Sequence, residues 1–229
     1  MADTNLYGCT YALFMHSLPK FGIQVQLVDF SKLDDVKRAL TPNTTMVYFE
    51  TPTNPCLKVN DIEAISKLAH EYNKDIKVVV DNTFASPYLQ KPLTLGADIV
   101  VHSCTKYING HSDLVAGAVC SKKEYIDQVA MVGIKDCTGA VLDPDAAFMI
   151  NRGLSTLCVR MDRHVQNAKK VVDYLTNCPY IKKVNYPGLD TNIGHEAAVK
   201  QMKDFGAMIS FETNLTFEQT KLFVNSLKV

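Results

Sequence analysis

The sequence predicts an α/β fold: a mostly parallel sheet sandwiched by helices, followed by part of a smaller α+β domain. Short runs rich in β-branched and aromatic residues alternate with longer segments whose apolar residues recur at helical spacing. This alternation is typical of βαβ units around a parallel sheet. The runs VYF at 47–49 and VVV at 78–80 are apolar throughout, as expected of strands that helices cover on both faces.

The elements of the first part follow from this alternation in chain order. Strands are expected at 23–30, 45–50, 76–81, 98–103 and 115–120, and helices at 31–40 and 61–73. Ser31 and Asp61 stand just before the apolar positions of the two helices, where an N-cap is needed. Both residue types accept hydrogen bonds from the free N–H groups of a first helical turn, so we expect them to cap these helices.

The second part begins with a long segment of helical period. From Pro144 to Cys178 the sequence is nearly free of glycine, with an interruption only at Gly153. We interpret this segment as the bridge between two domains, and expect these to span residues 1–152 and 153–229. The remaining elements are expected as strands at 181–187 and 207–213 and helices at 195–203 and from about 216.

Charge and cysteine usage exclude several classes of function. Lys+Arg and Asp+Glu each number 24, so no net charge attracts nucleic acid or anionic lipid. No apolar run approaches the roughly 18 residues that cross a bilayer, and no basic and then apolar leader opens the sequence. Seven cysteines without a CxxC pair predict reduced thiols. We therefore expect a cytoplasmic protein that binds a small molecule, and neither nucleic acid nor membrane.

Polar side chains follow three predicted strands at the point where each strand ends. VYFETPTNP supplies Asn54, VVVDNTF supplies Asp81, and DIVVHSCTKY supplies Ser103, Thr105 and Lys106. In open parallel sheets the ligand binds at the carboxyl ends of the strands. A carboxylate at a buried strand end is costly unless a cationic group meets it, and a lysine beside hydroxyls suits a phosphorylated ligand.

Pyridoxal 5′-phosphate (PLP) requires this set of groups. It needs a lysine for its Schiff base, a carboxylate that keeps its pyridine nitrogen protonated, and donors for its phosphate. Lys106 is predicted to be that lysine, Asp81 the carboxylate, and Ser103 and Thr105 the phosphate ligands. Taken singly, such an Asp is more often a turn former, and such hydroxyls more often satisfy local backbone. Their combination at successive strand ends favours the cofactor.

Two other kinds of site receive little support from the residues. His102 and His111 flank Lys106, but no paired carboxylate or cysteine pattern accompanies them, so we expect packing and hydrogen-bonding roles and no metal site. A nicotinamide-dependent oxidoreductase is disfavoured because no GxGxxG follows a predicted strand.

Three stretches carry a family resemblance over essentially the whole chain. They are YFETPTNP, VVVDNTFASPYLQKPLTLGADIVVHSCTKYINGHSDLVAGAV and RGLSTLCVRMDRHVQNA. In order and spacing they resemble the Cys/Met-metabolism branch of the fold-type I PLP-dependent enzymes. The resemblance implies a fold-type I major domain and a carbon-sulfur lyase activity. NLYGCT and MVGIKDCTGAVLDPDAAFMINRGL are most similar to branch members that cleave methionine to methanethiol, 2-oxobutanoate and ammonia, and members that cleave or make cystathionine are the alternative.

The resemblance also implies roles for residues that the pattern alone does not single out. Tyr7 would stack on the cofactor ring and take part in proton transfer, and Asn54 would bond the phenolic oxygen of the ring. Cys9, Lys135 and Asp136 would lie on the substrate side, near Tyr7. Without the resemblance, Cys9 suggests a small buried hydrophobe, Tyr7 a packing residue, and Lys135 with Asp136 an exposed pair in a loop.

The chain also departs from the family pattern. Cys104 stands where members commonly have alanine. By the resemblance, three parts are missing: an upstream segment that gives phosphate-binding residues to the neighbouring subunit, a glycine-rich turn that grips the phosphate, and a downstream arginine for the substrate carboxylate. We therefore expect a homo-oligomer, a dimer or tetramer, in a full-length form, and little turnover by these 229 residues alone. A truncated, non-catalytic chain is the alternative of another class.

Overall fold

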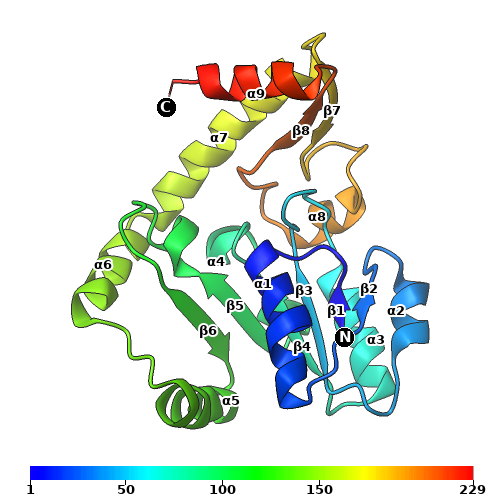
Figure 1. The fold of residues 1–229 in the computed structure, drawn as a ribbon, viewed down its shortest axis with the longest axis vertical. Coiled ribbons are helices and arrows are strands. Elements are labelled where there is room, and N and C mark those ends of the chain that lie inside the picture. The colour runs from blue at the N-terminus through cyan, green and yellow to red at the C-terminus, as the bar shows by residue number, and fades with distance from the viewer. Residues whose placement is uncertain (229) are drawn as a thin grey trace.

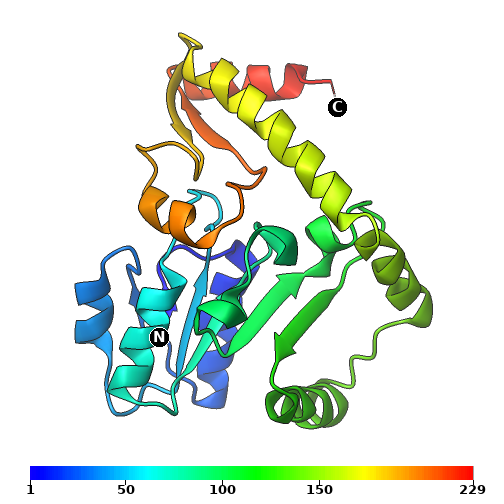
Figure 2. The same ribbon diagram turned by 180° about the vertical axis from the view of Figure 1, so that it is seen from behind.

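The computed structural model describes residues 1–228 and contains a large mixed sheet and a small second sheet (Figures 1 and 2). Within this range the large sheet has six strands in the order β2-β1-β3-β4-β5-β6, and only the edge strand β6 is antiparallel to its neighbour. Its strands are β1 (Ala2–Asp3), β2 (Leu27–Val28), β3 (Met46–Glu50), β4 (Lys77–Asp81), β5 (Ile99–Ser103) and β6 (Gly117–Ser121). The predicted α/β class is confirmed.

Helices cover both faces of this sheet and connect it to the second part. The α-helices are α1 (Gly8–Ala12), α2 (Leu33–Ala39), α3 (Ile62–Tyr72), α4 (Ser86–Leu89), α5 (Lys123–Gln128), α6 (Pro144–Leu154), α7 (Leu157–Thr176), α8 (His195–Gln201) and α9 (Phe217–Ser226). Shorter 3-10 or π-helical segments occupy Leu13–Ser17, Leu18–Phe21, Pro92–Leu95, Cys104–Ile108 and Val129–Thr138. None of the helices within residues 1–228 is both long and apolar enough to cross a membrane.

The alternation of side chains along β4 explains the two covered faces. Val78 and Val80 point to the face that α2 and α3 cover, where they join a core with Val36 and Ile65. Val79 points to the opposite face, which α1 and the turns after it cover, and packs in a second core with Ala2, Leu6 and Tyr48. Figure 1 shows α1 in front of the sheet, and Figure 2 shows α3 from the other side. Both faces are apolar for this reason.

One of the two predicted N-caps is confirmed. The Asp61 carboxylate accepts the Ala64 N–H at 2.9 Å at the start of α3. Ser31 does not cap α2, because Lys32 holds the cap position and the Ser31 hydroxyl instead donates to the Asp29 carboxylate at 2.7 Å. The Ser31 side chain is therefore used by the turn that precedes the helix.

The predicted strand at 23–30 is much shorter in the structure. Only Leu27 and Val28 pair, because their partner strand β1 is itself two residues long. The predicted interruption of the long helical segment also lies elsewhere: Gly153 is inside α6, and the break falls at Ser155 and Thr156. Their hydroxyls donate to carbonyls of the last turn of α6, which ends the helix there.

The second part begins with α6 and α7 and ends in a small antiparallel sheet. β7 (Ile181–Asn185) pairs with β8 (Ser210–Thr213), α8 lies between these strands in the chain, and α9 follows them with Thr216 in a capping box. Figure 1 shows α7 running away from the large sheet and this small sheet lying beside its far end. The predicted domain boundary, between residues 152 and 153, lies inside α6, and this division stays a prediction.

The segment around α8 ties the second part to the first close to the strand ends. Gln201 accepts the Ile62 N–H at 3.1 Å through its side-chain oxygen, and the Asn192 amide donates to the Leu57 carbonyl at 2.9 Å. Gly194, with a positive φ, approaches so closely that a Cβ would lie 1.9 Å from the Val59 carbonyl oxygen. The side-chain amides of Gln201 and Asn192 and the close approach at Gly194 thus hold the second part against the first.

We expect Gly153→Ala to destabilise the fold. A Cβ at Gly153 would meet the Asn109 carbonyl oxygen at 2.2 Å, so the loop after Lys106 must move away from α6. Such overpacking lowers the free energy of unfolding by about 1–3 kcal/mol, which urea unfolding followed by circular dichroism measures. Gly133→Ala is the control, because nothing lies within 4 Å of its Cβ position. Equal unfolding midpoints for the two variants would contradict the close approach.

Candidate active site

The carboxyl ends of β3, β4 and β5 lie side by side at one end of the large sheet, which is called the strand edge below. These strands are parallel neighbours, with Glu50 in register with Asp81 and Asp81 in register with Val101. The polar residues that follow the strands therefore gather at this edge, as the sequence predicted. Tyr7 joins them from the amino-terminal segment, because its N–H donates to the Glu50 carboxylate at 2.6 Å.

Asp81 is anchored through one of its two oxygens. Oδ1 accepts the Thr83 N–H at 2.9 Å and the Thr83 hydroxyl at 2.6 Å, and the same hydroxyl accepts the Ser103 N–H at 2.8 Å. Oδ2 lies 3.4 Å from the Tyr48 hydroxyl, a long contact. The carboxylate is thus fixed in place between β4 and β5 while Oδ2 keeps most of its capacity to accept a bond from a cationic N–H.

Thr83 is a site residue to which the sequence reasoning assigned no role. The signal for it is the spacing in DNT, since a hydroxyl two residues after an Asp commonly bonds that carboxylate. The sequence alone does not reveal the second contact, because Ser103 lies on another strand.

Lys106 lies in the helical turn Cys104–Ile108 that follows β5 directly. Its backbone (φ −91°, ψ −124°) departs from that of a helix, and its side chain is exposed. Lys106 therefore lies just after the end of β5, the strand next to the one that Asp81 ends.

Arg160 of α7 holds the turn that carries the lysine. Its guanidinium donates to the carbonyls of Tyr107 at 2.7 Å, Ile108 at 3.3 Å and Gly153 at 2.8 Å. Three carbonyls satisfied by one cation fix the turn against the corner between α6 and α7. The sequence reasoning gave Arg160 no individual role, although it lies in the stretch RGLSTLCVRMDRHVQNA.

Tyr7 and Cys9 lie together on the solvent-exposed side of the site, which is called its opening below. Tyr7 occupies the N-cap position of α1 with 50% of its surface exposed, and the Cys9 thiol lies 3.6 Å from its hydroxyl. This contact raises the pKa of Tyr7, so its hydroxyl keeps its proton. The alternative of a buried small hydrophobe is wrong for Cys9, which is exposed. Both side chains are therefore accessible to a molecule that binds at this edge.

Glu50 is a second site residue that the sequence reasoning missed. It is 5% exposed, and its carboxylate accepts the N–H of Tyr7 and, at 3.4 Å, that of Asn54. Burial raises the pKa of Glu50 to about 7, and the charges of Asp81 and Asp3 add to the rise. An ionisable group poised near neutral pH is typical of functional sites.

The two predicted phosphate ligands differ in the structure. The Thr105 hydroxyl accepts the Ala116 N–H at 3.1 Å and lies 3.3 Å from the Ala116 carbonyl oxygen, the local backbone role that we kept as the alternative. Ser103 uses its N–H for Thr83 and is partly exposed. A phosphate role for either hydroxyl stays a prediction, as does the role of the Asn54 amide.

Lys135 and Asp136 are not brought to Tyr7 within this chain. β6 is antiparallel to β5 and starts at Gly117, which pairs with Ser103. The chain therefore returns along β6, so that α5 starts at the amino ends of the parallel strands, away from the strand edge (Figure 1). The segment Val129–Thr138 continues α5 there. The two side chains form an exposed ion pair at 3.0 Å. They stand in a helical segment and not in the expected loop.

The histidines near Lys106 have structural surroundings. His102 is buried, and burial lowers its pKa, so the ring is neutral at physiological pH. His111 forms a hydrogen bond at 2.7 Å with the Asn109 carbonyl. In the part of the chain that the structure describes, no three His, Cys, Asp or Glu side chains come together as metal ligands do.

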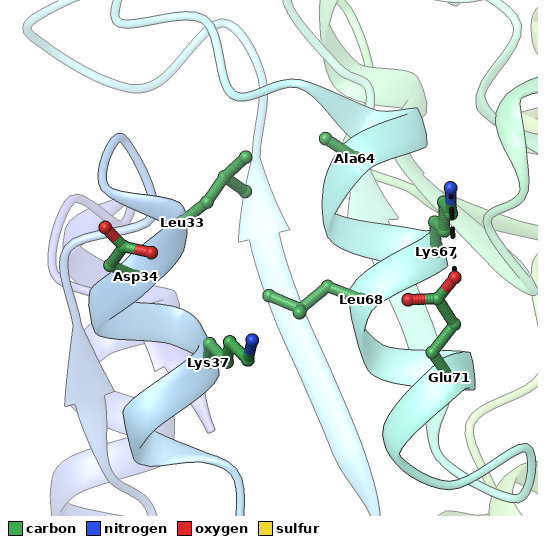
Figure 3. Close-up of a pocket in the computed structure, with 7 residues that line it drawn as sticks. All are labelled: Leu33, Asp34, Lys37, Ala64, Lys67, Leu68 and Glu71. Atoms are coloured by element: carbon green, nitrogen blue, oxygen red, sulfur yellow. Dashed lines mark ion pairs between the residues drawn. The ribbon is translucent and has the colours of Figure 1, made fainter.

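A surface hollow elsewhere on the sheet contains none of these residues. It lies between α2 and α3 and is lined by Leu33, Asp34, Lys37, Ala64, Lys67, Leu68 and Glu71 (Figure 3). The Lys67–Glu71 pair at its rim is solvent-exposed. The hollow has no group suited to catalysis beyond such exposed ion-pair residues, which leaves the strand edge as the candidate site.

Comparison with known proteins decides the family. The family model of the Cys/Met metabolism PLP-dependent enzymes matches residues 1–229. The chain belongs to this family. It is 59% identical over 229 residues to an L-methionine gamma-lyase of Fusobacterium nucleatum subsp. polymorphum, and 48% identical to a cystathionine beta-lyase of Lactococcus lactis subsp. cremoris. The matches cover 100% and 99% of this chain but 58% of each relative, so the chain spans little more than half the length of these relatives.

Solved structures agree with this membership. The crystal structure of metB from Corynebacterium glutamicum superposes with a TM-score of 0.94 at 44% identity, covering 99% of this chain and 58% of that one. The structure of a cystathionine gamma-lyase from Lactobacillus plantarum complexed with L-serine gives 0.92 at 42% identity, covering 100% and 59%. The family resemblance predicted from the sequence is thereby confirmed.

The residues at the strand edge fit PLP, the cofactor named in the family description. Oδ2 of the anchored Asp81 can accept a bond from a protonated ring nitrogen, the exposed Lys106 supplies an amine, and the half-exposed Tyr7 supplies an aromatic face. The Thr105 hydroxyl, expected to bind the cofactor phosphate, already accepts the Ala116 N–H, and this hydrogen bond competes with the expected role.

We expect Thr83→Val to weaken PLP binding while Thr83→Ser preserves it. Valine removes the hydroxyl that bonds both Asp81 and the Ser103 N–H, whereas serine keeps it. A hydrogen bond to a charged group is worth about 1.5–3 kcal/mol, so the dissociation constant should rise by about 10- to 100-fold for valine. Titration with PLP, followed by visible absorbance, measures it. Similar affinities for the two variants would exclude a role for the hydroxyl.

Proposed function

We propose that this chain forms the catalytic core of a PLP-dependent carbon-sulfur lyase that acts on L-methionine. The reaction is an α,γ-elimination that yields methanethiol, 2-oxobutanoate and ammonia. The observation that supports this proposal is that an anchored Asp81 and an exposed Lys106 follow neighbouring strands, with Tyr7 and Cys9 at the opening. The 59% identity to a protein named L-methionine gamma-lyase supports the choice of substrate.

Each side chain has a task that its surroundings favour. PLP, when bound, supplies an electron sink for charge that develops on the substrate. Asp81 holds the ring nitrogen in its protonated form, and Thr83 keeps that carboxylate oriented. The Nζ of Lys106 removes and returns the proton at the α-carbon. Tyr7, which keeps its proton, donates from its hydroxyl to the departing sulfur.

Cystathionine is the second candidate substrate, as in a cystathionine gamma-lyase or gamma-synthase. Relatives named cystathionine beta-lyase and a structure titled cystathionine gamma-lyase favour it at 48% and 42% identity. The residue that would discriminate is Cys9, which borders the Tyr7 hydroxyl. Lys135 and Asp136, expected beside it by resemblance, lie away from Tyr7 within this chain. In either case the partner is a small sulfur amino acid.

The assembly and location of the protein belong to the same proposal. A homo-oligomer, dimer or tetramer, is supported by large apolar side chains left exposed, such as Val115, Val141 and Phe148. A cytoplasmic location is supported by seven cysteines scattered without the spacing of a disulfide framework.

We expect PLP to attach to Lys106 in preference to the other lysines. Lys106 follows a strand end next to Asp81, whereas Lys58 is buried against Asp29 and the remaining lysines lack this setting. Borohydride reduction of the PLP-loaded protein and peptide mapping identify the modified residue. Lys106→Ala should abolish the label, and Lys122→Ala, a surface change before α5, should leave it intact. A label found mainly on another lysine would sink the assignment.

We expect Cys9→Ala to change substrate preference more than cofactor affinity. The thiol contacts the Tyr7 hydroxyl at the opening, whereas Asp81 and Lys106 hold the cofactor. The ratio of kcat/KM for methionine to that for cystathionine should shift about tenfold, a difference of about 1.4 kcal/mol, with the PLP dissociation constant unchanged. Cys158→Ala, at an exposed position of α7, is the control. An unchanged ratio would remove Cys9 from the determinants of specificity.

A further inference from the structure

We propose that Glu50 is a positioning residue of the PLP site, whose single carboxylate fixes the two loops that carry Tyr7 and Asn54. It binds the backbone N–H of Tyr7 and the backbone N–H of Asn54. The inference rests on the proposed function for what the side chains of those two residues do. The hold on their backbones is a property of the chain itself.

The two hydrogen bonds join two loops that lie far apart in the sequence. Tyr7 is 43 residues from Glu50 in sequence and precedes the short helix α1, whose N-cap position has no side-chain hydrogen bond of its own. Asn54 lies in the loop after β3 and uses the other carboxylate oxygen. Each oxygen of Glu50 therefore serves one loop, at 2.6 Å for Tyr7 and 3.4 Å for Asn54.

The ionised form of Glu50 makes the stronger hold. A carboxylate offers two equivalent acceptor oxygens, whereas a carboxylic acid donates with one of them and accepts more weakly. Replacing the acid by its amide has a similar effect, because the NH₂ group of Gln cannot accept a bond. The order of both loops should therefore depend on the charge of this one group.

The surroundings of Glu50 bring its change from neutral acid to carboxylate near neutral pH. Burial raises the pKa of Glu50 to about 7, Asp81 on β4 and Asp3 on β1 add negative charge, and Tyr48 on the same strand contributes a neutral phenol. Lys58 offsets part of the charge of Asp3, at 4.0 Å. The two N–H groups oppose the rise without cancelling it. The hold on both loops thus strengthens as the pH rises through about 7.

The effect on global stability has the opposite sign. The folded pKa of Glu50 exceeds its ordinary value of 4.5, so its contribution to stability is complete below about pH 4.5 and is lost as the pH rises through about 7. If this position served only the stability of the fold, a neutral side chain would stabilise it more than an ionisable one. Glu50 orders the two loops in the pH range where its charge weakens the fold, which is expected of a group retained for the site.

Amide hydrogen exchange of the cofactor-free chain tests the proposal directly. Protection factors of the Tyr7 and Asn54 amides are measured between about pH 5 and about pH 9, each corrected for intrinsic exchange. In the wild type both should rise by about tenfold with a midpoint near 7, since charge-assisted bonds are roughly twice as strong as neutral ones. In Glu50→Gln both should stay at the low level throughout. Asp98→Asn is the matched control, because Asp98 accepts the Val78 N–H at the other edge of the sheet.

The outcomes separate this proposal from the proposed function. Protection that is independent of pH in the wild type, or equal in Glu50→Gln and Asp98→Asn, would overturn the role of Glu50 even if the protein binds PLP. Added PLP should shift the wild-type midpoint to lower pH, because a cationic ring at Asp81 offsets the charge that acts on Glu50. A midpoint that PLP leaves unchanged would contradict the placement of the ring at Asp81, while the cofactor-free profile still supports Glu50.

Discussion

Three carboxylates, those of Asp3, Glu50 and Asp81, end the adjacent strands β1, β3 and β4 of one apolar sheet. Because burying a carboxylate without partners costs several kcal/mol, each must be compensated. Asp3 has a cationic partner in Lys58 and an amide donor in Asn60. Among the described residues, Glu50 is bonded by two backbone N–H groups, and Asp81 by the N–H and hydroxyl of Thr83, both at Oδ1. Because Oδ2 of Asp81 has a single long contact, Asp81 is the carboxylate best suited to accept a bond from a cationic ligand.

The surrounding fold fixes the groups that work with Asp81. The apolar strands are covered on both faces, so polar groups can gather only where the strands end. Arg160 fastens the turn that carries Lys106 to α7, and Gly153 lets α6 approach the same turn. Side chains near α8 bind Ile62 and Leu57, behind the loop that holds Asn54. The long helices therefore support the lysine, and the small second part supports the loop.

The sequence predicted best what depends on local pattern. β3, β4 and α3 were expected to within one residue at each end, because apolar runs and the cap at Asp61 are local signals. β1 and α1 were missed, since two and five residues show no periodicity. The helix break was misplaced at Gly153 because its position depends on the hydroxyls of Ser155 and Thr156, which end α6 by bonding its carbonyls.

The site divides in the same way. Asp81 and Lys106 follow buried strands, so their position at one edge could be predicted from the topology. The roles of Glu50 and Arg160 could not, because they arise from contacts with segments 43 and 53 residues away. Lys135 was expected near Tyr7 from resemblance alone, and the path of the chain through β6 leads away from it.

The two halves of the site differ in how firmly they are held. The half that holds Asp81 is fixed by the hydroxyl and N–H of Thr83 and by the N–H of Ser103, groups that carry no titratable charge near neutral pH. The half that carries Tyr7 and Cys9 is the start of a short helix, where the N–H of Tyr7 is bonded to the ionisable Glu50. A cofactor needs a fixed partner for its charge, whereas a substrate must enter and leave past the opening. The division of bonds between Thr83 and Glu50 matches these separate demands, since the loops of Tyr7 and Asn54 can loosen as Glu50 takes up a proton, whereas the bonds of Asp81 to Thr83 do not depend on that proton.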